Sequence, residues 1–159
     1  MTIQTGDAIP EVTLKHIRDG VETIDTPTLF AGKRVVLFAV PGAFTPTCSE
    51  KHLPSYIEHF DAFRERGIEV ACMAVNDPFV MQAWGDSLAV PPGLMMLSDG
   101  NGDFSRALGL EMDASAYGMG SRSKRFALFA EDGVVRSLFV EAPGEYRVSD
   151  AAHVLAAIG

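Results

Sequence analysis

The stretch RVVLFAVPGAFTPTCSE, residues 34–50, contains the segment that determines the fold. Its first part, Arg34–Val40, is apolar and rich in β-branched residues, which predicts a strand buried on both faces. Apolar residues then recur at helical spacing over Leu53–Arg66, and Gly67 can end that helix. A second buried strand is expected over Ile68–Val75. Two buried strands joined by a helix predict a right-handed βαβ unit in a parallel sheet.

Strand and helix patterns continue to alternate through the rest of the chain. We expect helices over Pro78–Ser87, Asp103–Leu108 and Asp150–Ile158, and strands over Leu94–Leu97, Arg125–Ala130 and Val134–Val140. The last two strands flank Glu131-Asp132-Gly133, which is typical of a hairpin turn. A parallel βαβ half followed by an antiparallel hairpin and a terminal helix predicts an α/β, thioredoxin-like domain, with a central mixed sheet flanked by helices.

Length and composition indicate one globular domain spanning residues 1–159, because 159 residues are too few for two ordinary domains. Hydrophobic residues make up 47% of the chain and charged residues 21%, as in soluble globular proteins. The formal net charge of −8 argues against binding to nucleic acid, which requires Lys and Arg to neutralise phosphates.

Nothing in the sequence predicts a membrane or secretory location. The longest apolar run, Val35–Val40, is far shorter than the roughly 20 residues of a membrane span. The N-terminal MTIQTGDAIP has neither the basic nor the apolar region of a signal peptide. We therefore expect a cytoplasmic protein that does not contact membranes.

The chain has two cysteines, Cys48 and Cys72, which are too few for a disulfide scaffold. A structural zinc site would need histidines to join them, and no histidine lies at ligand spacing beside a cysteine pair. The sequence contains no flavin, nicotinamide or metal motif, so we expect no cofactor and no metal.

Cys48 is a candidate nucleophile because of its position. It follows the carboxyl end of the first buried strand, where open α/β sheets bind ligands, and lies in the first turn of a helix. Unpaired N–H groups and the positive end of the helix dipole favour the reactive thiolate there. The alternative is an inert, buried small side chain, but Thr, Pro, Ser and Glu surround Cys48 instead of apolar residues.

Two further residues of this segment have alternative interpretations. Thr45 stands where a C-x-x-C motif would have its first cysteine, which argues against a dithiol reductase. Its hydroxyl is able to hydrogen-bond both a thiolate and a substrate oxygen. Pro41 either simply ends the strand or shields the sulfur from water.

Pro41, Thr45 and Cys48 form the pattern P-x-x-x-T-x-x-C, which resembles the active-site signature of the peroxiredoxins. The blocks PGAFTPTCSEKHLP, VNDPFVMQAW, SDGNGDFSRALGL and SRSKRFALFAEDGVV resemble the type II, peroxiredoxin-5-like subfamily. The similarity extends from about Gly6 to the C-terminus.

The resemblance implies a thioredoxin-fold thiol peroxidase with an antioxidant function. Cys48 would be the peroxidatic cysteine, whose thiolate attacks hydrogen peroxide or an organic hydroperoxide to give a sulfenic acid. Thr45 would hold the peroxide and Pro41 would cover the pocket. The family also has an arginine beside the sulfur; by position this is Arg125, with Arg122 as its rival. A guanidinium there would stabilise the thiolate and the developing charge on oxygen.

Cys72 is expected to be an inert core residue, because it lies among apolar residues of a predicted strand. Some plant-like relatives are discussed as using an equivalent cysteine to resolve the sulfenic acid, and others use one near the C-terminus, which this chain lacks. We therefore expect an external thiol, either glutathione with or without glutaredoxin, or thioredoxin. Phe44, Phe79 and Trp84 are by default expected to pack in the core. The resemblance instead implies a homodimer, in which the equivalent aromatics line the pocket rim and a two-fold dimer contact.

Three further points remain open from the sequence: the role of His52, a helix cap, and a second possible function of Cys48. His52, one turn after Cys48, either orients the loop or lowers the pKa of the thiol, or is a solvated or capping histidine. Thr47 and Glu50 fit the pattern of a helix capping box. The same Cys48 chemistry would also serve a peroxide sensor that relays its oxidation to a partner protein.

Overall fold

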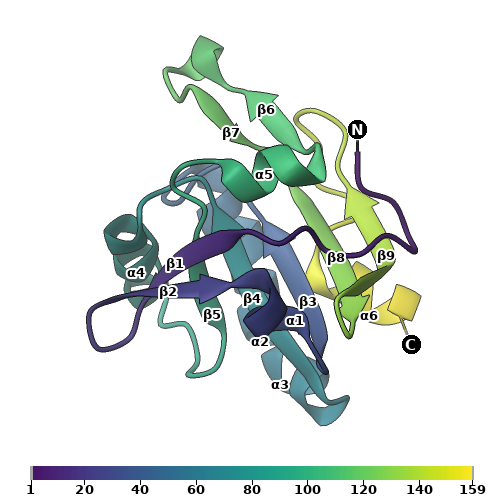
Figure 1. Ribbon diagram of the computed structural model, residues 1–159. Helices are drawn as coiled ribbons and strands as arrows, with labels where there is room; N and C mark the ends of the chain where they lie inside the picture. Colours follow the sequence, from purple (N-terminus) through teal and green to yellow (C-terminus); the bar gives the residue numbers. More distant parts are fainter. Residues whose placement is uncertain (1, 159) are drawn as a thin grey trace.

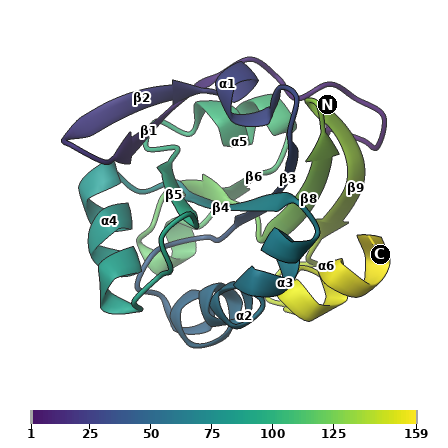
Figure 2. The same cartoon turned by 90° about the horizontal axis from the view of Figure 1, so that it is seen from below.

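The computed structural model describes residues 2–158, which form a seven-stranded mixed sheet with helices on both faces (Figures 1 and 2). The strands, in the order in which they lie side by side, are β2 (Val21–Asp25), β1 (Thr13–Ile17), β5 (Met95–Ser98), β4 (Ile68–Ala74), β3 (Arg34–Ala39), β8 (Phe126–Glu131) and β9 (Val134–Val140). The helices are α1 (Thr26–Phe30), α2 (Leu53–Glu58), α3 (Phe60–Glu65), α4 (Pro78–Ser87), α5 (Asp103–Leu108) and α6 (Ala151–Ile158), together with the π-helical turn η1 (Cys48–His52) and the 3-10 turn η2 (Ser115–Tyr117). A separate hairpin, β6 (Glu111–Asp113) and β7 (Ser121–Ser123), projects from the body in Figure 1.

The predicted βαβ unit lies at the centre of the sheet. β3 and β4 are parallel, with Phe38 opposite Cys72, and both strands are buried along almost their whole length. Side chains alternate between the faces: Phe38 packs with Tyr56 of α2, whereas Leu37 belongs to the core on the α1 and α5 side. Figure 2 shows α1 and α5 on one face of the sheet and α2, α3 and α6 on the other. The sheet is therefore buried on both sides, which explains why its central strands are continuously apolar.

Most predicted elements are confirmed to within a residue or two of their expected ends. The helix expected over Leu53–Arg66 differs, because it is interrupted at His59 into α2 and α3 and is preceded by η1. The capping box from Thr47 to Glu50 was wrong. Thr47 already has helical dihedrals (φ −64°, ψ −38°), so its side chain does not make the cap hydrogen bond.

The N-terminal strands β1 and β2, helix α1 and the β6–β7 hairpin were not predicted. β1 and β2 alternate in polarity around the turn at Asp19-Gly20, and β1 extends the sheet through the pair Lys15 and Ser98. Their mixture of exposed and buried positions is a weaker signal than the apolar runs of β3 and β4. Among the described residues, no helix combines the length and apolar character needed to cross a membrane.

The hydrogen bond that caps the N-terminus of α4 can be tested by substitution. The side chain of Asp77 accepts a hydrogen bond from the Val80 N–H at 2.8 Å, and Pro78 occupies the first turn. Asp77→Ala should lower the free energy of unfolding by about 1 kcal/mol, because one orphan N–H loses its acceptor. Denaturant unfolding measures this loss. The control, Asp86→Ala on the exposed surface of α4, should change stability by less than about 0.5 kcal/mol; equal losses in both variants would contradict the cap.

Candidate active site

Cys48 begins the π-helical turn η1, directly after the loop that leaves the carboxyl end of β3. Its side chain is completely buried. The N–H of Leu53 bonds to the carbonyl oxygen of Cys48, five residues earlier, and so closes the wide π turn. Pro54 gives the local reason: it has no N–H for an α-helical bond, and its ring would clash with the carbonyl four residues earlier. Such π turns are frequent at functional sites.

Arg125 contacts the sulfur because of the sheet topology. It immediately precedes β8, which runs antiparallel to β3 with Phe126 opposite Ala39. The first residues of β8 therefore lie at the carboxyl end of β3, beside the segment that leads to Cys48. Arg125 Nη2 donates a hydrogen bond to Cys48 Sγ at 3.1 Å, and Nη1 donates to His52 Nδ1 at 2.9 Å. The structure thus places Arg125 on the sulfur.

Arg122, the rival arginine, contacts a different part of the loop. Its Nη1 donates to the carbonyl oxygen of Pro41 at 3.4 Å, and its Nε donates to that of Met119 at 2.9 Å. Gly42 permits this approach, because a Cβ at that position would lie 2.9 Å from Met119 Cε and 3.0 Å from Arg122 Nη1. Arg122 therefore secures the loop backbone at Pro41 and not the sulfur.

Thr45 and Pro41 are both half-buried in the loop that precedes Cys48. Thr45 Oγ1 donates a hydrogen bond to the carbonyl oxygen of Gly42 at 2.7 Å. Because this bond uses the hydroxyl proton, the lone pairs of the Thr45 oxygen are left to accept a hydrogen bond from a bound O–H group. The adjacent Phe44 has a left-handed backbone (φ 64°), an uncommon conformation for a non-glycine residue that is concentrated at functional loops.

His52 is buried, so the interpretation of a solvated histidine was wrong. Its Nδ1 faces Arg125, and its Nε2 lies 3.1 Å from the carbonyl oxygen of Ser149. Burial, followed by the positive charge of Arg125, lowers the pKa of His52 to about 3. The imidazole is therefore neutral at physiological pH.

A loop that the sequence did not single out completes the surroundings of Arg125. Glu141, at the end of β9, accepts hydrogen bonds from the backbone N–H groups of residues 147–149 and from Ser149 Oγ. These bonds lower the pKa of Glu141 although its burial opposes them. Tyr146, on the same loop, covers the Arg125 guanidinium at 5.8 Å from the ring centroid. Glu141 and Tyr146 carry no motif, and only their position after a predicted strand could have drawn attention to them.

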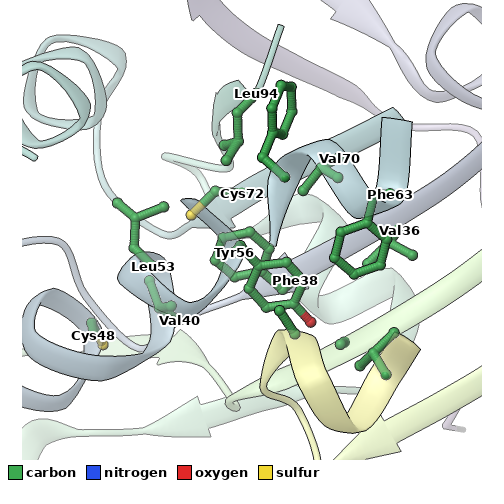
Figure 3. Packing of buried hydrophobic residues seen from close by; sticks show 14 of the residues in the cluster. Val36, Phe38, Val40, Cys48, Leu53, Tyr56, Phe63, Val70, Cys72 and Leu94 are labelled. Carbon is green, nitrogen blue, oxygen red and sulfur yellow. The ribbon is translucent and has the colours of Figure 1, made fainter. Parts of the chain in front are cut away.

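Cys72 lies inside the core on β4 and is completely buried. Burial, and secondarily the charge of Cys48, raises the pKa of the Cys72 thiol well above its ordinary value. In the view of Figure 3, the side chains of Leu53 and Val40 lie between the two cysteines. Both cysteines are free thiols in the structure.

Comparison with known proteins agrees with this geometry. The sequence matches the Redoxin family over residues 4–155. It is 48% identical to peroxiredoxin-2E-2, chloroplastic, from Oryza sativa subsp. japonica, covering 99% of this chain and 73% of that protein, and 43% identical to peroxiredoxin-2B from Arabidopsis thaliana, covering 98% of both. The crystal structure of reduced Prx3 in complex with H2O2 from Vibrio vulnificus superposes with a TM-score of 0.95 at 47% identity, covering 99% of this chain and 100% of that one.

The chain belongs to the peroxiredoxins. The fold and the family that the sequence predicted are thereby confirmed, and the peroxiredoxin-2 names of the plant relatives agree with the type II resemblance. As a peroxiredoxin, the protein is a thiol-dependent peroxidase with an antioxidant function: its substrate is a peroxide and its electrons come from a thiol.

The buried, neutral His52 makes stability depend on pH. The unfolded chain protonates this histidine near pH 6.5, whereas the folded peroxiredoxin does so only near pH 3. Between these values the unfolded state binds the extra proton, so the His52 contribution is complete above pH 6.5 and is lost as the pH falls. The slope should reach about 1.4 kcal/mol per pH unit.

Denaturant unfolding between pH 7 and pH 5 measures this slope, above the range in which most carboxylates titrate. His52→Asn should be less stable at pH 7 but should show a flatter slope than wild type. His153→Asn, at an exposed position of α6, retains His52 and should keep the wild-type slope. An unchanged slope in His52→Asn would show that this histidine does not take up the proton on unfolding.

Proposed function

We propose that Cys48 is the peroxidatic cysteine of this thiol peroxidase, with Arg125, Thr45 and Pro41 as its catalytic partners. The observation that carries the proposal is the contact of Arg125 Nη2 with Cys48 Sγ at 3.1 Å. A guanidinium keeps its charge at all physiological pH values, so this donor favours the thiolate, which is the nucleophilic form of cysteine. The buried surroundings strengthen that interaction relative to water.

The proposed chemistry is a two-electron displacement on the peroxide. The Cys48 thiolate attacks the distal oxygen of hydrogen peroxide or an organic hydroperoxide, an S–O bond forms and the O–O bond breaks. The leaving oxygen takes a proton from solvent and departs as water or an alcohol, while the sulfur becomes a sulfenic acid. Thr45 Oγ1 accepts a hydrogen bond from the peroxide O–H, and Arg125 stabilises the charge that develops on oxygen. Pro41, which is half-buried in the loop that precedes Cys48, limits the access of water to the sulfur.

We further propose that an external thiol, glutathione with or without glutaredoxin, or thioredoxin, reduces the sulfenic acid. The thiol condenses with it to a mixed disulfide and releases water, and a second thiol then frees Cys48 and leaves as the external disulfide. Two properties of Cys72 support this route: it is buried in β4, and its pKa is raised, so it supplies little thiolate. Because Cys48 is buried too, glutathione or a protein thiol reaches the sulfur only after η1 opens locally.

Steady-state and stopped-flow kinetics test the roles of the two cysteines and of the arginine. Cys48→Ser should abolish peroxide consumption, whereas Cys72→Ser should retain turnover with at least one of glutathione, glutathione plus glutaredoxin, or thioredoxin. Arg125→Lys should lower the second-order rate constant with hydrogen peroxide by about 100-fold, as expected for loss of a preorganised donor.

The matched control is Arg136→Lys, at an exposed position of β9, which should react like wild type. Loss of turnover in Cys72→Ser would refute the external route. An Arg125→Lys variant as fast as wild type would remove the observation on which the site assignment depends.

We also propose that the protein is a homodimer whose contact includes Phe44 and Phe79. These two side chains are 56% and 65% exposed, which is unusual for large apolar residues. They lie on neighbouring segments, because the Ala43 N–H donates to the side chain of Asn76, just before α4. Trp84, the third aromatic expected there, is instead buried and donates its indole N–H to Ser49 Oγ at 2.9 Å.

Sedimentation velocity tests the dimer. Wild type should sediment with the mass of two chains, and Phe79→Asp should shift it to one chain, because the contact would bury an unpaired carboxylate. Val21→Asp, an equally polar change at an exposed apolar residue of β2, should leave the dimer intact. A monomeric wild type would refute this proposal without affecting the assignment of Cys48.

A further inference from the structure

The two ring nitrogens of His52 have distinct and fixed partners. The guanidinium of Arg125 has donors but no acceptor, so Nδ1 must accept its hydrogen bond at 2.9 Å. The carbonyl oxygen of Ser149 is an acceptor, so Nε2 must carry the proton and donate at 3.1 Å. Only the neutral tautomer with a proton on Nε2 satisfies both contacts, and its aromatic neighbours Phe38 and Tyr146 leave the ring little freedom to turn.

We propose that His52 is a positioning residue, whose Nδ1 holds the Arg125 guanidinium so that Nη2 is aimed at Cys48 Sγ. The inference rests on the proposed role of Cys48 as the peroxidatic cysteine. His52 itself touches neither the sulfur nor, on this account, the peroxide, and acts through Arg125.

The argument follows from the geometry of the guanidinium. Nη1 and Nη2 belong to one rigid planar group, so fixing Nη1 on His52 also fixes the direction in which Nη2 points. The Tyr146 ring lies against the guanidinium, and the backbone carbonyl of Arg125 accepts from the Glu141 N–H at 3.0 Å. These contacts place the side chain near the sulfur, but among them only the His52 bond, besides that to the sulfur, is directional at the guanidinium nitrogens.

His52 is in turn anchored from outside η1. The Ser149 carbonyl oxygen that accepts the hydrogen bond from His52 Nε2 also accepts one from Tyr56 Oη at 2.7 Å. Ser149 is held by its N–H and its hydroxyl, both of which donate to Glu141 Oε2. A continuous series of hydrogen bonds thus runs from Glu141, at the end of β9, to the sulfur of Cys48.

The charged and titratable groups around His52 favour the neutral form that this role requires. Arg125 presents a permanent positive charge from the start of β8, and the negative charge of Glu141 at the end of β9 is already shared among N–H donors. Tyr56 of α2 and Tyr146 of the 141–150 loop face the ring, and Cys48 lies on the same helical turn. Protonation would place a second positive charge against the guanidinium in a buried site.

Three substitutions of His52 separate positioning from simple packing. The side-chain oxygen of Asn reaches about as far as Nδ1 and can accept from Arg125, whereas the amide of Gln extends about as far as Nε2 and serves Ser149 instead. Leu fills the space but replaces neither contact. The measurements are the single-turnover rate constant of Cys48 oxidation by hydrogen peroxide, and the pH at which Cys48 alkylation by iodoacetamide is half-maximal, in a Cys72→Ser background.

We expect hydrogen peroxide to oxidise Cys48 at least about 10-fold more slowly in His52→Leu and His52→Gln, because a hydrogen bond that orients a charged donor is lost. Their alkylation midpoints should move to higher pH, because the guanidinium stabilises the thiolate less well. His52→Asn should restore the rate to within about 3-fold of the background protein and restore its midpoint.

Wild-type rates and midpoints in His52→Gln and His52→Leu would overturn the inference, as would an Asn variant no better than the Gln variant. If His52→Leu does not fold, as judged by circular dichroism and cooperative unfolding, the comparison of Asn with Gln still decides. If the Cys72→Ser background protein itself is not oxidised at Cys48, the proposed function fails first, and that result is distinguishable because no variant would then react.

Discussion

The contact between the Arg125 guanidinium and the Cys48 sulfur is the interaction on which the functional part of this structure depends. It joins residues 77 positions apart, so the contact itself depends on the tertiary fold. Cys48 is placed by the loop at the end of β3 and by the π turn η1, whereas Arg125 is placed by the antiparallel pairing of β8 with β3. The sheet order therefore serves chemistry as well as packing, because it brings a permanent cation to the carboxyl end of the central strand.

Such a site is costly to build, because the half-buried Arg125 cation loses part of its hydration beside the buried Cys48. The structure offsets that cost with hydrogen bonds to and around Arg125. His52 accepts a hydrogen bond from the guanidinium, and the Ser149 carbonyl oxygen accepts one from His52. Glu141 in turn fixes Ser149 by accepting a hydrogen bond from its N–H. This arrangement requires a neutral His52, since a charged imidazole would repel the guanidinium instead of accepting its hydrogen bond.

The sequence predicted the parts of the fold and site whose signal is local. The apolar runs of β3 and β4, the Asp77-Pro78 start of α4 and the position of Cys48 were all visible as patterns, and the resemblance to the peroxiredoxins added Arg125. The role of His52 was not visible, because it arises from contacts with residues 73 and 97 positions away and from burial that a polar residue does not reveal in its own sequence. Glu141 bonds to residues only six to eight positions away, but no motif marks the loop that it organises. The break at His59 and the π turn also escaped a helical periodicity count, although Pro54 marks where an α-helix must widen.

The most direct test of the account is to identify the oxidised atom. The reduced protein receives one equivalent of hydrogen peroxide, is quenched within seconds with a sulfenic-acid trap, and is analysed by intact mass and peptide mapping beside Cys48→Ser and Cys72→Ser variants. The account predicts one trap adduct, mapped to Cys48 and unchanged in Cys72→Ser. A loss of two hydrogens that requires Cys72 would contradict the external thiol route, and the absence of any adduct or disulfide at Cys48 would contradict the central claim that this sulfur is the site of peroxide reduction.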